Sequence, residues 1–381
     1  MDNKAYWIWL SLAAGPGSTL PRKLVEYFDG DIKAIYEADE FQYRQAKATP
    51  KRIAALSDKS LCEAENIIKW CTDKKVKILT YGDAQYPERL KSIVDWPPVL
   101  YYIGELYNID DELCLGTVGT RSMTKYGHDT AYSFCYDLAR SGAIIVSGLA
   151  SGIDTTCHRA ALDAGGRTVA VIGTRIDKVY PSENRDIMRE VARKGLLITE
   201  YHPFFETNPS NFPKRNRIIS GLSEATVVFE ADSRSGSLIT ADLAKKQGRD
   251  VYALPGRIGE QGAVGTNDLI REGSKMVTRA KDIIDDYCDR YELKTNSEYL
   301  YDYSPKPIRN DSFGKKQKET IIPITDDLQK QIYGMLNINT PISAEQIVIP
   351  GRNYSEIVSA LTMLELSGYV IAHPGNAYTK K

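Results

Sequence analysis

Residues 211–242 read NFPKRNRIISGLSEATVVFEADSRSGSLITAD, and this stretch decides the expected fold and site. The apolar run from Ala225 to Glu230 is typical of a buried strand, and the small residues 233–237 predict a turn before another helix. Free backbone N–H groups at such a turn suit a phosphate-rich ligand, and the cations at 214, 215 and 217 would neutralise its charge. We therefore predict an anion-binding groove on a parallel α/β sheet.

Length and composition bound the possible classes of protein. The chain has 381 residues, enough for two or three domains, and its 42% hydrophobic and 26% charged residues are ordinary for a globular protein. A net charge of −1 excludes a globally basic, histone-like DNA-binding protein, but it allows a local basic patch. Cysteine and histidine spacing shows no CxxC and no metal-ligand pattern, and no apolar run is long enough to span a membrane. We expect a cytoplasmic protein with reduced thiols and without a metal site or cofactor.

Strand and helix patterns alternate between residues 113 and 286. The expected strands are 113–118, 143–146, 168–172, 196–199, 225–229 and 250–253, with a weaker seventh at 275–277. The expected helices are 127–140, 154–164, 184–193, 214–222 and 237–247. Near-continuous apolar strands separated by helices predict a Rossmann-like, doubly wound parallel sheet.

In open sheets of this kind, ligands bind beyond the carboxyl ends of the strands. The loops that follow the expected strands carry six cations, namely Arg121, Arg175, Lys214, Arg215, Arg217 and Arg234. We predict that these side chains converge on one rim of the sheet. Glu200, directly after a strand, could be catalytic, but we favour a role in ordering Arg215 or Arg217 through a bidentate ion pair.

The two ends of the chain predict smaller domains. Residues 1–108 are expected to form a helical domain with connector strands, and Ala14 to Gly17 resembles a helix-hairpin-helix turn, although a plain packing turn is the favoured explanation. A Rossmann-like domain over 109–288 and a linker over 289–321 would follow. Residues 322–381 predict three helices and a hairpin, as in a winged helix. Their five acids against four bases suit protein docking at least as well as phosphate binding.

Several catalytic motifs are missing. No GxxxxGK[ST] string occurs, which makes an ATPase improbable, and Gly116 to Gly119 is not GxGxxG. A nucleophile elbow would need serine where Ala150 stands. Asp154 and His158 have the spacing of an acid–base pair, but a helix-capping aspartate and a packed histidine explain them more simply.

Several blocks of the sequence then carry a family resemblance. SGLASGIDTTCH at 147–158, GGRTVAVIGTRIDKVYPSEN at 165–184, FPKRNRIISGLS at 212–223, SGSLITA at 235–241 and GRDVYALPG at 248–256 resemble the DNA-processing protein A (DprA/Smf) family. The N-terminal region resembles that family's SAM-like, helix-hairpin-helix domain, and the tail resembles its winged helix. The resemblance implies a non-enzymatic protein that binds single-stranded DNA, protects incoming DNA, dimerises and helps load the RecA recombinase in natural transformation.

The resemblance also implies a set of site residues. The phosphate pocket would comprise Gly119, Arg121, Ser147, Gly148, Lys214, Arg215, Asn216, Arg217, Ser235 and Gly236. Arg175 stands where the family usually has glycine and would add a cation. Phe212 is either a base-stacking partner or a core aromatic residue. The dimer interface would lie near Leu269, Ile270 and Met276, with the recombinase docking close by.

Two other functions stay open. The sheet also resembles nucleotide phosphoribohydrolases of the lysine-decarboxylase-like group, which carry PGGxGTxxE. Gly236 and Thr240 fit that pattern, but Leu243 stands where the catalytic glutamate belongs, so the chemistry would lack its base. The third candidate is a winged-helix regulator whose sheet domain senses a nucleotide.

Overall fold

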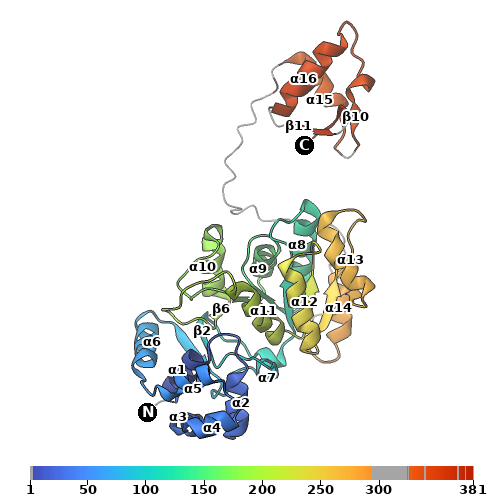
Figure 1. The fold of residues 1–381 in the computed structure, drawn as a ribbon. Helices are drawn as coiled ribbons and strands as arrows, with labels where there is room; N and C mark the ends of the chain where they lie inside the picture. Colours follow the sequence, from blue (N-terminus) through green and yellow to red (C-terminus); the bar gives the residue numbers. More distant parts are fainter. Residues whose placement is uncertain are drawn as a thin grey trace. The chain divides into compact units, whose positions relative to one another are not determined.

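The structure is a computed structural model that describes residues 3–293, 324, 326–338, 340–366, 369–373 and 375–380. It divides into two compact units, Met1–Arg309 and Asn310–Lys381, which are described separately below (Figure 1). The linker predicted at 289–321 lies outside the described residues from position 294 onward. Within the described ranges, no helix combines the length and the apolar character needed to cross a bilayer.

The first unit is built on a nine-stranded, mostly parallel sheet in the order β1-β2-β6-β5-β4-β3-β7-β8-β9. Its strands are β1 (Lys77–Thr80), β2 (Val99–Gly104), β3 (Cys114–Val118), β4 (Ile144–Ser147), β5 (Thr168–Val171), β6 (Leu196–Thr199), β7 (Ala225–Val228), β8 (Asp250–Ala253) and β9 (Lys275–Met276). From β3 to β9 every pairing is parallel, and all seven strands expected there are confirmed. The chain runs outward from β3 to β6 and then returns to place β7 beside β3.

Helices cover both faces of the sheet. They are α8 (Lys125–Arg140), α9 (Ile153–Asp163), α10 (Arg185–Lys194), α11 (Asn211–Leu222), α12 (Gly236–Lys246), α13 (Val264–Arg271) and α14 (Ala280–Tyr287). Neighbouring strand residues point to opposite faces, so Ile144 joins the apolar cluster under α10, α11 and α12, whereas Ile145 joins the cluster under α8, α9 and α14. In Figure 1, α11 and α12 lie side by side across one face. This is the doubly covered α/β architecture that the sequence predicts.

The N-terminal residues form helices, as expected. These are α1 (Lys4–Ala14), α2 (Leu20–Tyr27), α3 (Ile32–Glu37), α4 (Glu40–Gln45), α5 (Pro50–Ser57), α6 (Cys62–Asp73) and the short α7 (Glu88–Lys91). The connector strands β1 and β2 extend the main sheet, because β2 pairs antiparallel with β6, with Tyr101 opposite Thr199. Trp7 and Leu10 belong to the same continuous apolar cluster as Val171 of β5. The N-terminal helices and the sheet therefore share one core.

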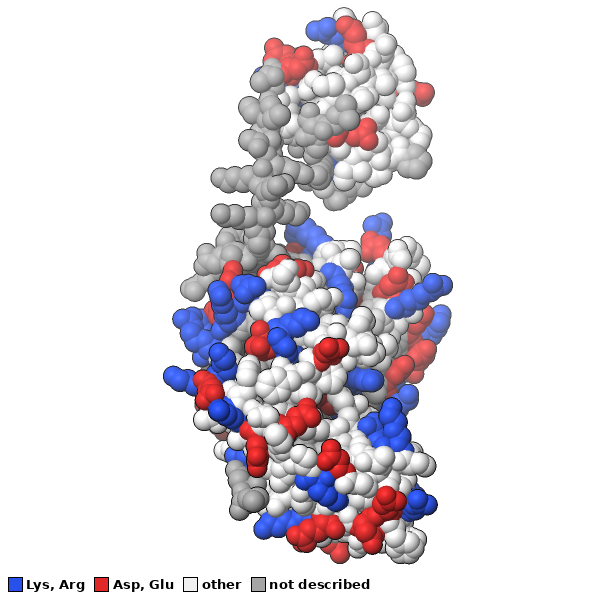
Figure 2. Space-filling view, turned by 60° about the vertical axis from the view of Figure 1, so that its left-hand side comes forward, with Lys and Arg blue, Asp and Glu red and all other residues white. Residues whose placement is uncertain are grey.

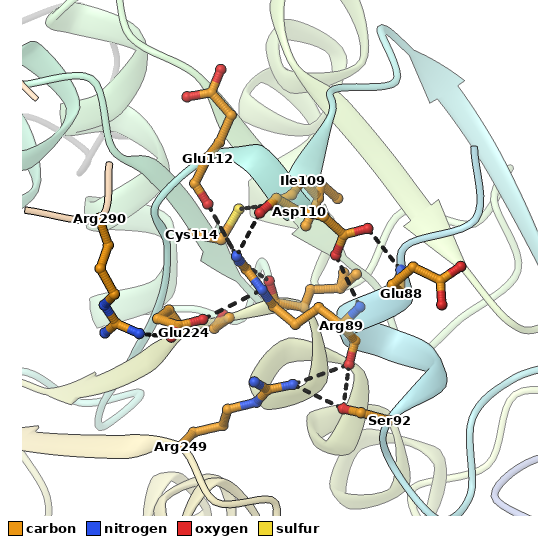
Figure 3. Close-up of polar contacts among 12 residues, drawn as sticks. Glu88, Arg89, Ser92, Ile109, Asp110, Glu112, Cys114, Glu224, Arg249 and Arg290 are labelled. Atoms are coloured by element: carbon orange, nitrogen blue, oxygen red, sulfur yellow. Dashed lines mark hydrogen bonds and ion pairs between the residues drawn. The ribbon is translucent and has the colours of Figure 1, made fainter. Parts of the chain in front are cut away.

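A polar cluster around Arg89 fixes the connector to the sheet (Figure 3). Arg89 is buried, and its guanidinium donates to the carbonyl oxygens of Leu222 at 3.3 Å and of Glu112 at 3.3 and 3.4 Å. Its Nε also lies 3.5 Å from the carboxylate of Glu224, which precedes β7. The Asp110 carboxylate accepts hydrogen bonds from the backbone N–H groups of residues 88 and 89 and so caps α7. A buried charge with this many acceptors holds its neighbours in one arrangement.

The second unit has its own small core. Its elements are α15 (Asp327–Met335), β10 (Ile342–Ser343), η5 (Ala344–Gln346), α16 (Tyr354–Leu366), β11 (Val370–His373) and β12 (Ala377–Lys380). The strands form a three-stranded sheet in the order β10-β12-β11, and Ile332, Leu361 and Val370 are buried between the sheet and the helices. The hairpin and the two longer helices confirm the predicted elements, whereas the expected short helix is a single 3₁₀ turn. Pro374 of the predicted hairpin turn lies outside the described residues.

Candidate functional site

A cavity of about 390 Å³ opens at the carboxyl ends of β3 and β7. The strand order reverses between these two strands, and a crevice forms at such a point because the connections leave in opposite directions. Three segments supply the walls of this β3/β7 cavity: the loop after β3, the first turns of α11, and the turn between β7 and α12. Its lining residues are Val118, Gly119, Thr120, Arg121, Ala150, Asp154, Phe212, Pro213, Arg215, Asn216, Ile219, Asp232, Arg234, Ser235, Gly236, Ser237, Ile239 and Thr240.

The turn between β7 and α12 has the features of an anion site. Ser235 caps α12, because its hydroxyl accepts a hydrogen bond from the backbone N–H of Ser237 at 3.4 Å. Open space lies where a Cβ on Gly236 would project, so a ligand can approach the backbone there. Thr240 lies one helical turn further along the cavity wall, and its buried Oγ1 has no hydrogen-bond partner among the described residues. The positive end of the α12 dipole favours a negatively charged ligand at this point.

The loop after β3 supplies an exposed cation. A Cβ on Gly119 would lie 2.5 Å from Ile153 Cγ1, so only glycine allows the loop to pass this close to α9. Thr120 N donates to Glu230 O at 2.7 Å and thereby holds the loop against the end of β7. Arg121 is exposed, and its guanidinium carbon lies 5.9 Å from the centre of the Phe212 ring. Arg121 forms no ion pair with a described residue and is therefore available to a ligand.

Arg215 is an interior residue. Its Nη1 donates to Gly148 O at 2.6 Å and also to Val171 O, and only 4% of the residue is exposed. A Cβ on Gly148 would lie 2.5 Å from Arg215 Nη2, so glycine is required for this contact. Burial lowers the pKa of Arg215 to about 10, which still leaves it charged at neutral pH. Arg215 thus holds the loop after β4 in place while reaching one wall of the cavity.

Asp154 also holds the loop after β4 in place. Its carboxylate accepts hydrogen bonds from the backbone N–H of Gly148 at 3.1 Å and of Ala150 at 3.4 Å. Burial raises the pKa of Asp154, while the charge of Arg215 acts in the opposite direction. His158 is fully buried, and its Nδ1 lies 2.7 Å from Thr168 Oγ1. The packed His158 matches the simpler explanation drawn from the sequence. The expected capping role of Asp154 is wrong, because Gly152 is the N-cap of α9 and the Asp154 carboxylate instead accepts hydrogen bonds from the loop after β4.

Arg217 is also buried, which corrects the prediction that six cations line one rim. Its guanidinium makes a bidentate ion pair with Glu200, at 3.0 and 2.7 Å, and its Nε lies 3.3 Å from Asp95. The physical reason is that α11 is exposed only in its first turn, at Pro213 and Lys214, while residues 217–222 are buried. The predicted pairing of Glu200 with an arginine is confirmed.

Four further predicted residues lie outside the cavity wall, and one of them, Gly148, lines the adjoining small recess instead. Ser147 is fully buried and donates to Thr117 O at 2.6 Å, so its hydroxyl is already used. Arg175 Nε lies 2.8 Å from Asp177, which neutralises the extra cation locally. Lys214 is exposed beside the cavity and forms no ion pair with a described residue. The predicted residues that do line the β3/β7 cavity are Gly119, Arg121, Phe212, Arg215, Asn216, Ser235 and Gly236.

Sequence reasoning missed other lining residues. Thr120 follows Gly119 directly, and Thr240 follows Gly236 by four positions on one helix face, so both positions carried a detectable signal. Ile219 and Ile239 give the cavity an apolar component that the charge pattern did not suggest. Figure 2 shows positive and negative side chains interspersed over the face in view, in keeping with a local rather than a general basic surface.

Similarity to known proteins identifies the family of this chain. The model of the family "DNA recombination-mediator protein A" matches residues 77–288, which contain the whole β3/β7 cavity. Protein Smf of Synechocystis is 30% identical over the full length of this chain and 99% of its own. The chain belongs to this DNA processing protein A family. The family resemblance drawn from the sequence blocks is thereby confirmed.

Solved structures of the family agree with the fold. DNA processing protein A of Streptococcus pneumoniae is 33% identical, with a TM-score of 0.66 over 75% of this chain and 98% of its own. The Helicobacter pylori protein is 30% identical, with a TM-score of 0.52 over 57% of this chain and 97% of its own. The family blocks at 147–158, 212–223 and 235–241 form the loop after β4 with the first half of α9, nearly all of α11, and the first half of α12. The segments that carry the resemblance are therefore those that build and support the cavity.

Proposed function

We propose that this protein binds single-stranded DNA, with backbone phosphates in the β3/β7 cavity, and that it processes incoming DNA in natural transformation. The observation that carries the proposal is the N-terminus of α12. Ser235 caps it, its backbone at Gly236 is open to a ligand, and it faces the same cavity as the exposed Arg121 and Arg234. Helix N-termini and unpaired arginines are general phosphate ligands. The structure of the Helicobacter pylori relative is described as revealing a single-stranded DNA binding mode, which supports the same reading here.

The proposed roles divide by accessibility. Residues on the cavity wall or beside it would contact the strand, and these are Arg121, Lys214, Asn216, Ser235 and Gly236. Buried residues would shape the site, and these are Ser147, Gly148, Arg215 and Arg217, together with the half-buried Gly119 of the cavity wall. Arg175, paired with Asp177, would contribute little charge to the groove.

The N-terminal domain would extend the groove. Gly17 lies between α1 and α2 with φ of 71°, and a Cβ there would lie 3.9 Å from Lys214 Cδ and from Arg217 Nε. A turn of this kind can hold a phosphate on its backbone N–H groups. We propose that residues 1–108 act as a SAM-like, helix-hairpin-helix domain that continues the strand's path beyond Lys214.

The remaining assignments concern partners. We propose that residues 322–381 form a winged helix that docks on protein, and that the protein dimerises and helps load RecA. Of the residues expected at the dimer interface, Leu269 is only 4% exposed and packs inside its own chain, so it is corrected to a core residue. Met276 on the edge strand β9 is 52% exposed, and Ile270 is partly buried. These two residues remain the proposed contact.

We further propose that the site binds without chemistry. Leu243 of α12 offers no general base where the related phosphoribohydrolases have glutamate. Incubation with nucleoside monophosphates should release no free base, and release would revive the enzymatic alternative. Loss of all DNA binding on removal of residues 322–381 would instead favour the winged-helix regulator.

The proposed site is tested by charge reversal. Arg121→Glu and Lys214→Glu should each weaken binding of oligo-dT at least about tenfold in an anisotropy titration, because each replaces an attraction to phosphate by a repulsion. Arg189→Glu on α10, an exposed arginine outside both the cavity and the N-terminal domain, is the matched control and should bind like the wild type. Circular dichroism would show that all three variants are folded. Wild-type affinity in both groove variants would refute the site.

A further inference from the structure

Tyr180 presents an aromatic ring beside the β3/β7 cavity. It lies in the loop between β5 and the 3₁₀ turn η2 (Ser182–Asn184), and it is 47% exposed. Its ring centre is 4.9 Å from that of Phe212, with an angle of 30° between the ring planes. The Tyr180 and Phe212 rings therefore form a tilted pair in contact, of which Tyr180 is the outer, more exposed member.

The ring of Phe212, the inner member of the pair, is half-buried. A Cβ on Gly173 would lie 2.7 Å from Phe212 Cδ1, so the loop after β5 closes on one side of that ring. Arg121 lies 5.9 Å from its centre, and Tyr180 packs against it as well. Phe212 is half-buried and shows only part of its ring to the cavity, whereas Tyr180 is 47% exposed and offers the more accessible aromatic surface at this site.

The loop that carries Tyr180 is anchored to the glycine-rich loop after β4. Asn184 is buried, and its Nδ2 donates to Leu149 O at 2.8 Å. The Ser151 hydroxyl donates to Glu183 Oε1 at 2.9 Å. On the other side of Tyr180, the Thr174 hydroxyl donates to Lys178 O at 3.0 Å. These bonds hold the tyrosine in a fixed position relative to the cavity, which lowers the entropy lost on binding.

Tyr180 is also contiguous with the proposed phosphate site. A recess of about 40 Å³ is lined by Tyr180 together with Arg121, Ala150, Phe212 and Arg215. The last four of these residues also line the β3/β7 cavity. The recess is too small to take up a nucleobase, so a base at this point would lie on the exposed ring rather than inside the protein.

We propose that Tyr180 is a base-stacking residue, which receives an unpaired nucleobase of the strand whose phosphates occupy the β3/β7 cavity. This proposal rests on the proposed function and adds to it a contact with the bases. A tyrosine ring offers a rigid apolar face at low entropic cost, and stacking accepts every base. Bases in a duplex already stack on one another, so this contact would favour single strands over duplexes.

The test separates base contacts from phosphate contacts. Tyr180→Ala and Tyr180→Phe are titrated with oligo-dT and with an abasic deoxyribose-phosphate oligomer of the same length. Loss of one stacking contact, worth about 1–3 kcal/mol, should lower the affinity of Tyr180→Ala for oligo-dT by about 5- to 150-fold. Its affinity for the abasic oligomer should stay within about twofold of the wild type, and Tyr180→Phe should match the wild type on both. Tyr180→Leu replaces the alanine variant if that variant does not fold.

Each other outcome overturns either the stacking proposal or the proposed function. Unchanged affinity of Tyr180→Ala for oligo-dT, with binding lost in Arg121→Glu, overturns the stacking proposal and leaves the proposed function standing. Equal losses on oligo-dT and on the abasic oligomer also overturn it, because the tyrosine would then act through the backbone path. Failure of the wild type to bind either oligomer overturns the proposed function itself.

Discussion

Arg217 and Glu200 form a bidentate ion pair in the interior of the protein, with Nη1–Oε1 at 3.0 Å and Nη2–Oε2 at 2.7 Å. The side chains are only 3% and 4% exposed. Asp95, which precedes β2, adds a third carboxylate oxygen 3.3 Å from Arg217 Nε. The pair therefore joins α11, the end of β6 and the connector to the N-terminal helices directly beneath the proposed groove.

Removing one partner of this ion pair should lower the free energy of unfolding. In Glu200→Gln one charge of the pair is lost and the guanidinium stays buried, which typically costs about 3–5 kcal/mol. Urea denaturation would measure the change in the free energy of unfolding. Asp95→Asn is the matched comparison, with a smaller expected loss because Asp95 is 27% exposed. A loss below about 1 kcal/mol in Glu200→Gln would contradict the structural role.

The Arg89 cluster should stabilise the junction between connector and sheet. Arg89→Met keeps an unbranched side chain but leaves the Glu224 carboxylate and several carbonyl oxygens without their donor. We expect a loss of about 2–4 kcal/mol in urea denaturation. Arg44→Met, on the surface of α4, should change stability by no more than about 0.5 kcal/mol. Equal effects of the two substitutions would show that the cluster contributes nothing.

The buried His158 should make stability depend on pH. Burial, with the nearby charge of Arg215, lowers its pKa from 6.5 to about 3, so the unfolded chain binds a proton that the folded chain excludes. Stability from this group is complete above pH 6.5 and falls as the pH drops toward 3, by about 1.4 kcal/mol per pH unit. Urea denaturation at pH 7 and pH 5 would show a smaller decrease in His158→Asn than in the wild type. An identical decrease in both proteins would exclude this histidine as the cause.

Charge on the edge of the sheet should disrupt a dimer. Met276 is exposed on β9, so Met276→Glu would place two carboxylates in the proposed interface without disturbing the core. Light scattering should report the mass of a monomer for this variant and of a dimer for the wild type. Arg189→Glu, at an exposed position on α10 away from the proposed contact, is a control for charge alone. A dimer that persists in Met276→Glu would place the interface elsewhere.

The sequence predicted those parts of the fold that depend on local pattern. The strands from β3 to β8 are near-continuous apolar runs between helices, and their alternation defines the sheet without knowledge of distant contacts. The cavity could be located because ligand sites follow the carboxyl ends of parallel strands. The burial of Arg215 and Arg217 could not be predicted, because it depends on which carbonyl and carboxylate groups lie opposite α11. The Tyr180–Phe212 contact likewise joins the loop after β5 to the first turn of α11, two segments that are far apart in the sequence.

The central claim is that the β3/β7 cavity binds the phosphates of a single DNA strand. Titration of the purified protein with oligo-dT and with its duplex at two salt concentrations tests it most directly. We predict tighter binding of the single strand, an affinity whose logarithm falls by about 0.7 per neutralised phosphate as the logarithm of salt rises, and a shallower slope in Arg121→Glu. Equal affinity for duplex and single strand, with a salt dependence that Arg121→Glu leaves unchanged, would contradict the claim.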